Sequence, residues 1–125
     1  MKKILIIEDN ELLLKMIEFI LKKNGFETTV AKTGKEAINA LHETPFDLII
    51  TDLMLPYANG FEIIEHIKQN KAQNQVPVII ISAVVNEETV MAGFDSGVDD
   101  YIKKPFTPGE LLSRVTRLLK VNVTA

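Results

Sequence analysis

The sequence contains no cysteine. This absence excludes disulfide bonds, thiolate catalysis, iron–sulfur clusters and cysteine-ligated zinc. Long apolar runs are absent too: the most apolar stretch, residues 76–85, has about ten residues and contains Pro77, whereas a membrane-spanning helix needs roughly 18. At the start of the chain only the short apolar run 4–7 follows Lys2 and Lys3, which is too short for a secretory signal. We therefore expect a soluble cytoplasmic protein that does not contact membranes.

Positive charge is in the minority. The chain has 14 lysine and arginine residues against 17 aspartate and glutamate residues, a formal net charge of −3. A protein that binds nucleic acid by neutralising phosphates usually carries the opposite sign, so we expect no direct nucleic-acid binding. With 125 residues, 46% of them hydrophobic, the chain is long enough to bury a core. We expect a single domain over residues 1–125.

Short apolar runs rich in β-branched residues alternate with segments of helical periodicity. Parallel strands joined by helices produce this alternation. The sequence therefore predicts an α/β fold of the flavodoxin-like (βα)5 type, a doubly wound parallel five-stranded sheet in the order 2-1-3-4-5 with helices on both faces. The predicted strands are residues 4–7, 28–31, 48–51, 78–81 and 101–102.

Polar side chains mark the beginnings of three predicted helices. Asn10, Thr33 and Thr107 stand where a side-chain oxygen can accept a hydrogen bond from a free amide of the first turn. Glu36 and Glu110 follow two of these caps by three residues, which is the spacing of a capping box. We expect the first, second and fifth helices to begin directly after these caps.

The first predicted helix is apolar over an unusually wide arc. Its apolar residues cover roughly 220° of the circumference, where a surface helix needs somewhat more than 100°. Two interpretations stay open. The extra width packs against a neighbouring helix, or the edge near Leu12 or Leu13 contacts a partner protein.

Polar residues follow four of the five predicted strands. Parallel strands joined by right-handed crossovers end at the same edge of the sheet, so these side chains should meet at one rim. Three carboxylates there repel one another unless one is protonated or a cation binds between them. Oxygen ligands without histidine or cysteine favour Mg²⁺ or Mn²⁺. The rim residues are Glu8, Asp9, Asp52, Ser82 and Lys104.

These rim residues form a set that fits phosphoryl transfer. It offers a carboxylate nucleophile, ligands for a cation, the ammonium of Lys104 and the hydroxyl of Ser82. Each residue taken alone is more typical of a helix cap, a turn or a solvated surface. Their joint position after strands far apart in the sequence is what indicates a site.

Four segments, in order along the chain, resemble the receiver domain of response regulators in two-component signalling, with a likeness to chemotaxis regulators. The resemblance covers essentially the whole chain. It implies a phosphoryl-accepting signalling switch and not an enzyme that acts on a separate substrate. The segments are residues 4–10, 47–56 followed by Asn59-Gly60, 77–83 and 97–106.

The resemblance gives roles to the acidic residues. It implies that Asp52 accepts the phosphoryl group and that Lys104 lies beside it. Asp9, Asp52 and the backbone carbonyl of Met54 would bind Mg²⁺ or Mn²⁺. Glu8 would bind the ion directly or through water.

The resemblance also implies a switch. The Ser82 hydroxyl would bind the new phosphoryl group, and Tyr101 would turn inward into the space that Ser82 leaves. The surface of the fourth helix, fifth strand and fifth helix would then change and signal to a downstream protein that the sequence does not identify. The resemblance further implies a cis peptide bond between Lys104 and Pro105.

The implied phosphoryl donor is a phosphohistidine on a histidine kinase or a histidine phosphotransfer protein. No lysine or arginine lies between Val84 and Ile102, so an ionic homodimer through the fourth helix is not expected. We expect a monomer or a weak, phosphorylation-dependent dimer. Arg114, Arg117 and Lys120 near the fifth helix are interpreted as a solvated face.

Two apolar residues predict a long-lived phosphoryl group. Met54 and Val84 stand two residues beyond Asp52 and Ser82, at positions that flank the phosphoryl group in the family that the chain resembles. Neither side chain can orient an attacking water. We therefore expect slow loss of the phosphoryl group.

Other interpretations stay open. The chain can be a receiver domain from a longer regulator with a DNA-binding or enzymatic output domain. A flavodoxin-like cofactor binder or a metal-dependent phosphatase is the alternative of a different class, but Glu8 and Asp9 would repel an unaccompanied phosphate. His42 and His66 are expected to be polar surface residues of two helices.

Overall fold

Five parallel strands form one sheet in a computed structural model that describes residues 1–55, 58–83 and 86–120. The order of the strands is β2-β1-β3-β6-β7. This is the predicted order 2-1-3-4-5, because β6 and β7 are the fourth and fifth strands of this sheet along the chain. The α/β fold class and all five predicted strands are confirmed. The strands are β1 (Lys3–Ile7), β2 (Glu27–Ala31), β3 (Leu48–Asp52), β6 (Val78–Ser82) and β7 (Asp100–Lys103).

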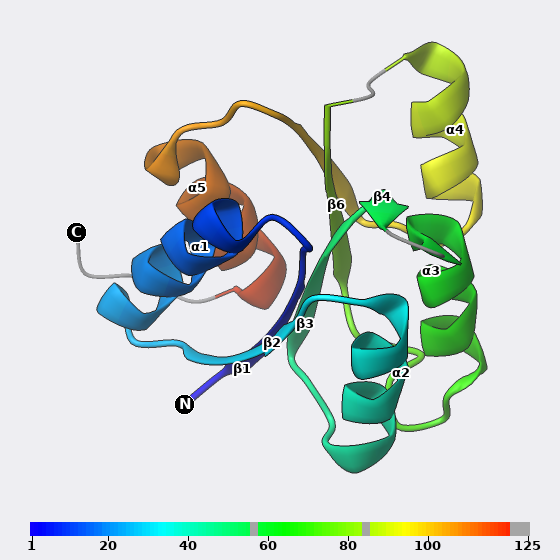
Figure 1. Ribbon diagram of the computed structural model, residues 1–125, viewed down its shortest axis with the longest axis horizontal. Coiled ribbons are helices and arrows are strands. Elements are labelled where there is room, and N and C mark those ends of the chain that lie inside the picture. Colours follow the sequence, from blue (N-terminus) through cyan, green and yellow to red (C-terminus); the bar gives the residue numbers. More distant parts are fainter. Residues whose placement is uncertain (56–57, 84–85, 121–125) are drawn as a thin grey trace.

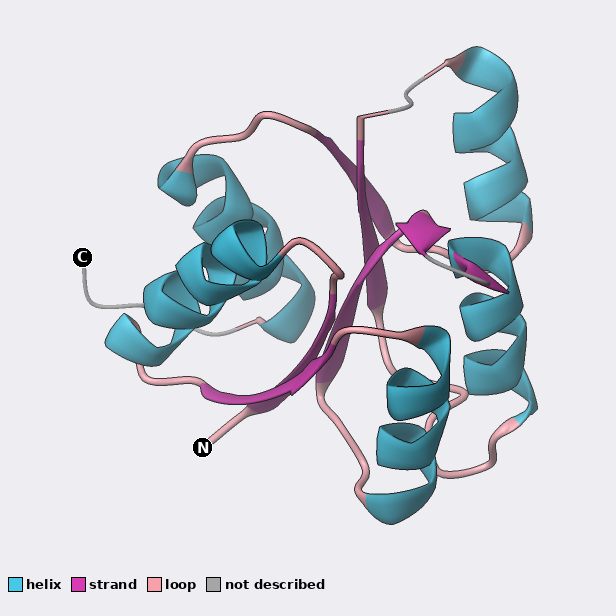
Figure 2. Cartoon of the chain, in the orientation of Figure 1, coloured by secondary structure: helices cyan, strands magenta, loops and turns pink. Residues whose placement is uncertain are grey.

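Helices cover both faces of the sheet, as predicted. One face carries α1 and α5, and the other carries α2, α3 and α4 (Figures 1 and 2). Within the described residues, no helix combines the length and the apolar character needed to cross a membrane. The helices are α1 (Glu11–Lys23), α2 (Gly34–Glu43), α3 (Gly60–Gln69), α4 (Glu87–Asp95) and α5 (Pro108–Leu119).

The core has two layers because side chains alternate along each strand. In β1, Ile4 and Ile6 pack with residues of α1 and α5. Leu5 and Ile7 of the same strand pack with residues of α2 and α3. All four side chains are buried, which is why this strand reads as a continuous apolar run.

The predicted caps are present. The Asn10 side chain accepts a hydrogen bond from the amide of Leu13, and Thr33 and Thr107 accept in the same way at α2 and α5. The capping box at α2 is shifted by one residue, because Glu36 accepts from the amide of Lys32 and not from that of Thr33. These caps fix where α1, α2 and α5 begin.

A short antiparallel hairpin follows β3, and the sequence did not predict it. It consists of β4 (Met54–Leu55) and β5 (Ala58–Asn59), with Met54 opposite Asn59. Strands of two residues are too short to produce an alternating pattern. The hairpin leads directly into α3 and holds the chain close to the end of β3.

Candidate functional site

The predicted rim exists at the carboxyl edge of the sheet. Asp52 and Ser82 are the last residues of β3 and β6, while Glu8 and Lys104 directly follow β1 and β7. Glu8, Asp52 and Ser82 are buried, and Asp9 is exposed. One carboxylate oxygen from each of the three acidic residues lies within 4.8 Å of the other two. The structure therefore brings the carboxylates together as the sequence predicts.

Lys104 joins the two buried carboxylates. Its Nζ atom lies 2.7 Å from Oδ2 of Asp52 and 2.8 Å from Oε1 of Glu8. The peptide bond between Lys104 and Pro105 is cis, as the family resemblance implies. The lysine thus enters the site from the loop that follows β7.

Backbone amides hold the other oxygen of each buried carboxylate. Oε2 of Glu8 accepts a hydrogen bond from the amide of Asn10 at 3.1 Å. Oδ1 of Asp52 accepts one from the amide of Met54 at 3.0 Å. Both carboxylates are therefore oriented from two sides before any ligand binds.

Burial and charge shift the titration of two residues at this site. Burial raises the pKa of Glu8, and hydrogen bonds from Lys104 and the Asn10 amide oppose part of that rise. For Lys104, burial alone lowers the pKa, but hydrogen bonds to Asp52 and Glu8 outweigh it and leave the pKa raised. Lys104 contacts two of the three clustered acidic side chains, so one positive charge is set against a group of three carboxyl groups. Three convergent carboxylates without histidine or cysteine fit a hard divalent cation.

Ser82 and Tyr101 lie next to each other beside the rim. The Ser82 side chain is fully buried, and Tyr101 is half-buried. Burial raises the pKa of Tyr101, and a hydrogen bond with the Ser82 side chain opposes that rise. The Tyr101 ring lies close to the backbone of Gly93 in α4. The two residues predicted to act as a switch are therefore in direct contact.

Met54, two residues beyond Asp52, is 64% exposed, so its apolar side chain lies largely in solvent. Val84, the second residue predicted to flank a phosphoryl group, lies outside the described residues.

The wide apolar arc of α1 is only partly packed. Leu12 is 83% exposed and Phe19 is 67% exposed, so this part of the arc does not pack against a neighbouring helix. Beside it lies a mostly apolar hollow of about 520 Å³ that reaches the acidic rim through Lys104. Its lining residues are Leu13, Met16, Ala83, Lys104, Pro105 and Phe106.

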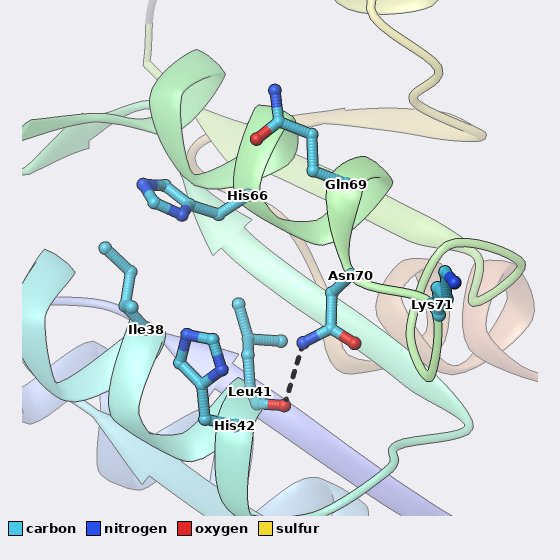
Figure 3. A pocket seen from close by; sticks show the side chains of 7 residues that line it. All are labelled: Ile38, Leu41, His42, His66, Gln69, Asn70 and Lys71. Carbon is cyan, nitrogen blue, oxygen red and sulfur yellow. Dashed lines mark hydrogen bonds between the residues drawn. The ribbon is translucent and has the colours of Figure 1, made fainter.

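The two histidines are exposed, as predicted, but the structure brings them to one place. His42 of α2 and His66 of α3 line a hollow of about 380 Å³ between these helices (Figure 3). Beside them the side chain of Asn70, the residue after α3, donates a hydrogen bond to the carbonyl of Leu41 in α2 (Figure 3). No sequence pattern predicts this proximity, because it arises from helix packing.

Arg114 and Arg117 do more than form the solvated face that the sequence suggests: Arg117 is exposed, as expected, but Arg114 is half-buried and both make ion pairs. Both guanidinium groups of α5 pair with the carboxylate of Asp100, which is buried in β7. The carboxylate also accepts from the amide of Tyr101. These contacts fasten α5 to the strand that carries Tyr101.

Comparison with known proteins agrees with this geometry. Residues 4–116 match the family model of the response regulator receiver domain. The phosphate regulon transcriptional regulatory protein PhoB of Escherichia coli (strain K12) is 37% identical over 119 residues, which are 95% of this chain and 52% of that protein. This chain spans about half the length of the curated relatives that it matches.

Two solved structures are similar over nearly their full length. The receiver domain of the Francisella response regulator 1452 has a TM-score of 0.89 and 36% identity, covering 96% of this chain and 98% of that one. The receiver domain of the sensor histidine kinase PA1611 from Pseudomonas aeruginosa PAO1 has a TM-score of 0.87 and 27% identity, with the same coverage. The latter structure has a magnesium ion coordinated in its active site cleft.

Proposed function

This chain belongs to the response regulator receiver domain family, and we propose that Asp52 is its phosphoryl acceptor. The observation that carries this proposal is the clamp on the Asp52 carboxylate. Lys104 contacts one oxygen and the Met54 amide contacts the other, at the mouth of the buried central strand. A nucleophile that is oriented before the reaction loses little freedom when a donor arrives.

The acceptor reaction follows from these contacts. A carboxylate oxygen of Asp52 attacks phosphorus of a phosphohistidine, the new O–P bond forms, and the N–P bond to the imidazole breaks. The imidazole nitrogen then takes a proton from solvent. Lys104 stays within reach of the phosphoryl oxygens and balances their charge.

The acidic residues fit a divalent ion. Glu8, Asp9, Asp52 and the Met54 carbonyl would hold Mg²⁺ or Mn²⁺, which supplies positive charge to the phosphoryl oxygens when bound. The carboxylates are close enough for this role, and the solved relative with magnesium in its cleft supports the choice of metal. Glu8 must release Lys104 or share it to reach the ion.

Ser82 and Tyr101 would report the state of Asp52. A phosphoryl group on Asp52 attracts the Ser82 hydroxyl, which now contacts Tyr101. Because Tyr101 packs on Gly93 of α4 and its amide is bound to Asp100, a change at Ser82 reaches α4 and α5. The altered surface of α4, β7 and α5 would then bind a downstream protein.

The expected donor is a histidine kinase or a histidine phosphotransfer protein. The exposed apolar residues of α1 and the hollow beside Lys104 form a surface on which such a donor can lie over Asp52. The curated relatives include proteins named as DNA-binding response regulators. We therefore propose that any nucleic-acid binding belongs to a separate output domain. We also propose that the receiver domain acts on no substrate beyond its own phosphoryl group.

Intact mass measurement tests this function. The chain is treated with acetyl phosphate and Mg²⁺, and we expect the mass to rise by one phosphoryl group. Asp52→Asn should not gain that mass. Asp47→Asn is the matched control, because Asp47 accepts from the Lys3 amide at the opposite edge of the sheet. Loss of phosphorylation in Asp47→Asn but not in Asp52→Asn would overturn the proposal.

A further inference from the structure

Gly60 lies directly against the backbone of Asp52 and Leu53, at the end of β3. It is the first residue of α3 and is buried. Its amide donates a hydrogen bond of 2.8 Å to the carbonyl oxygen of Leu53, the residue after Asp52. The start of α3 therefore lies directly on the end of β3.

A side chain at position 60 has no room. A Cβ atom there would lie 2.8 Å from the carbonyl oxygen of Asp52 and 2.9 Å from Cα of Leu53. Both are backbone atoms, so they cannot rotate away as the end of a side chain can. The backbone angles of Gly60 are not in the left-handed region. Space, and not conformational freedom, is what requires glycine.

From this close approach we propose that Gly60 is a positioning residue for the acceptor site. Because Gly60 has no side chain, the start of α3 can bind the carbonyl of the Leu53–Met54 peptide. The amide of the same peptide donates to Oδ1 of Asp52 and so orients the carboxylate. Gly60 has no side chain to offer a donor or a metal, so it would act through Asp52. This inference rests on the proposed function of Asp52.

A methyl group at position 60 should displace the acceptor without removing any side chain of the site. Alanine favours a helix more than glycine does, so Gly60→Ala would stabilise the chain if contacts played no part. Here the added Cβ must push the Asp52–Leu53 backbone away. We expect Mg²⁺ affinity and the rate of phosphorylation by acetyl phosphate each to fall about tenfold or more.

Gly109 provides a matched control. It lies in the first turn of α5, as Gly60 lies in that of α3, but the nearest atom to its added Cβ would be Thr107 Oγ1 at 4.0 Å. Titration calorimetry with Mg²⁺ alone, far below the melting temperature, compares Gly60→Ala, Gly109→Ala and the unaltered chain. Weaker binding in Gly60→Ala only is expected. Equal affinity in all three folded proteins would overturn the inference.

A measurement on the unaltered chain covers the case in which Gly60→Ala does not fold. The amide of Gly60 should shift in the NMR spectrum when Mg²⁺ is added, because it is bound to the peptide that bears the site, and the amide of Gly109 should not. An unshifted Gly60 amide alongside a shifted Met54 amide would contradict the inference. Failure of the proposed function is distinct, because the unaltered chain would then neither bind Mg²⁺ nor gain a phosphoryl group.

Discussion

Each buried carboxylate of the site is held by one lysine and one backbone amide. For Glu8 the partners are Lys104 and the Asn10 amide, and for Asp52 they are Lys104 and the Met54 amide. A third carboxylate, that of Asp9, is exposed at the entrance. Glu8 and Asp52 are therefore held in place on both oxygens, while Asp9 is the more accessible of the three acidic residues.

Glu8 makes the stability of the metal-free chain depend on pH. Burial raises the pKa of Glu8, so the folded chain keeps this proton at pH values where the unfolded chain has lost it. In that window the unfolded state binds fewer protons, and the contribution of Glu8 to stability falls as pH rises. We predict that Glu8→Gln gains stability relative to the unaltered chain as the pH rises above the ordinary pKa of a glutamate side chain. Urea denaturation without metal measures this.

Added Mg²⁺ provides the control for that prediction. It should stabilise the unaltered chain more than Glu8→Gln, because the variant has lost one anionic ligand. A pH-independent difference between the two proteins in the absence of metal would contradict the assigned titration of Glu8.

Met54 should set the lifetime of the phosphoryl group. Its exposed apolar side chain cannot hold a water for attack on the phosphorus. We predict that Met54→Asn loses phosphate about tenfold faster, while Met54→Leu keeps the slow rate. Phosphate release after removal of acetyl phosphate measures both. Equal rates for Met54→Asn and Met54→Leu would count against this role.

At the scale of elements, α1 exposes apolar residues that do not pack into the core of the described structure. Leu12 and Phe19 are mostly exposed, so replacing both with serine should change the unfolding free energy little. We predict that transfer from a phosphorylated histidine donor protein slows about tenfold, because the apolar contact is lost. Phosphorylation by acetyl phosphate should stay unchanged. Lys35→Ser is the control, because Lys35 is exposed on α2 over the other face of the sheet, and equal slowing in it would refute the role of the apolar face.

The opposite edge of the sheet depends on one buried amide. The Gln73 side chain donates to the carbonyls of Leu41 and Thr44 and accepts from the amide of Phe46, and so ties two loops together. Gln73→Leu leaves these groups without partners and should cost about 1–3 kcal/mol. Urea denaturation measures this. The rate of phosphorylation by acetyl phosphate should not change, and a parallel loss of rate would show that the two edges are coupled.

At the scale of the whole molecule, periodicity and strand-end chemistry predicted most of the fold and the acidic rim. Apolar runs report burial on both faces, and a parallel sheet then requires Glu8, Asp52 and Lys104 to meet at one edge. Contacts that depend on packing between helices and strands left no such pattern. The pairing of Arg114 with Asp100 and the short hairpin at Met54 therefore appeared only in the structure.

Chemical location of the phosphoryl group tests the central claim most directly. An acyl phosphate on aspartate is reduced by borohydride to homoserine, so the chain is phosphorylated with acetyl phosphate and Mg²⁺, reduced, digested and read by tandem mass spectrometry. The account predicts homoserine at position 52 and unmodified aspartate at positions 9, 47 and 100. Homoserine at another aspartate, with Asp52 intact, would contradict it.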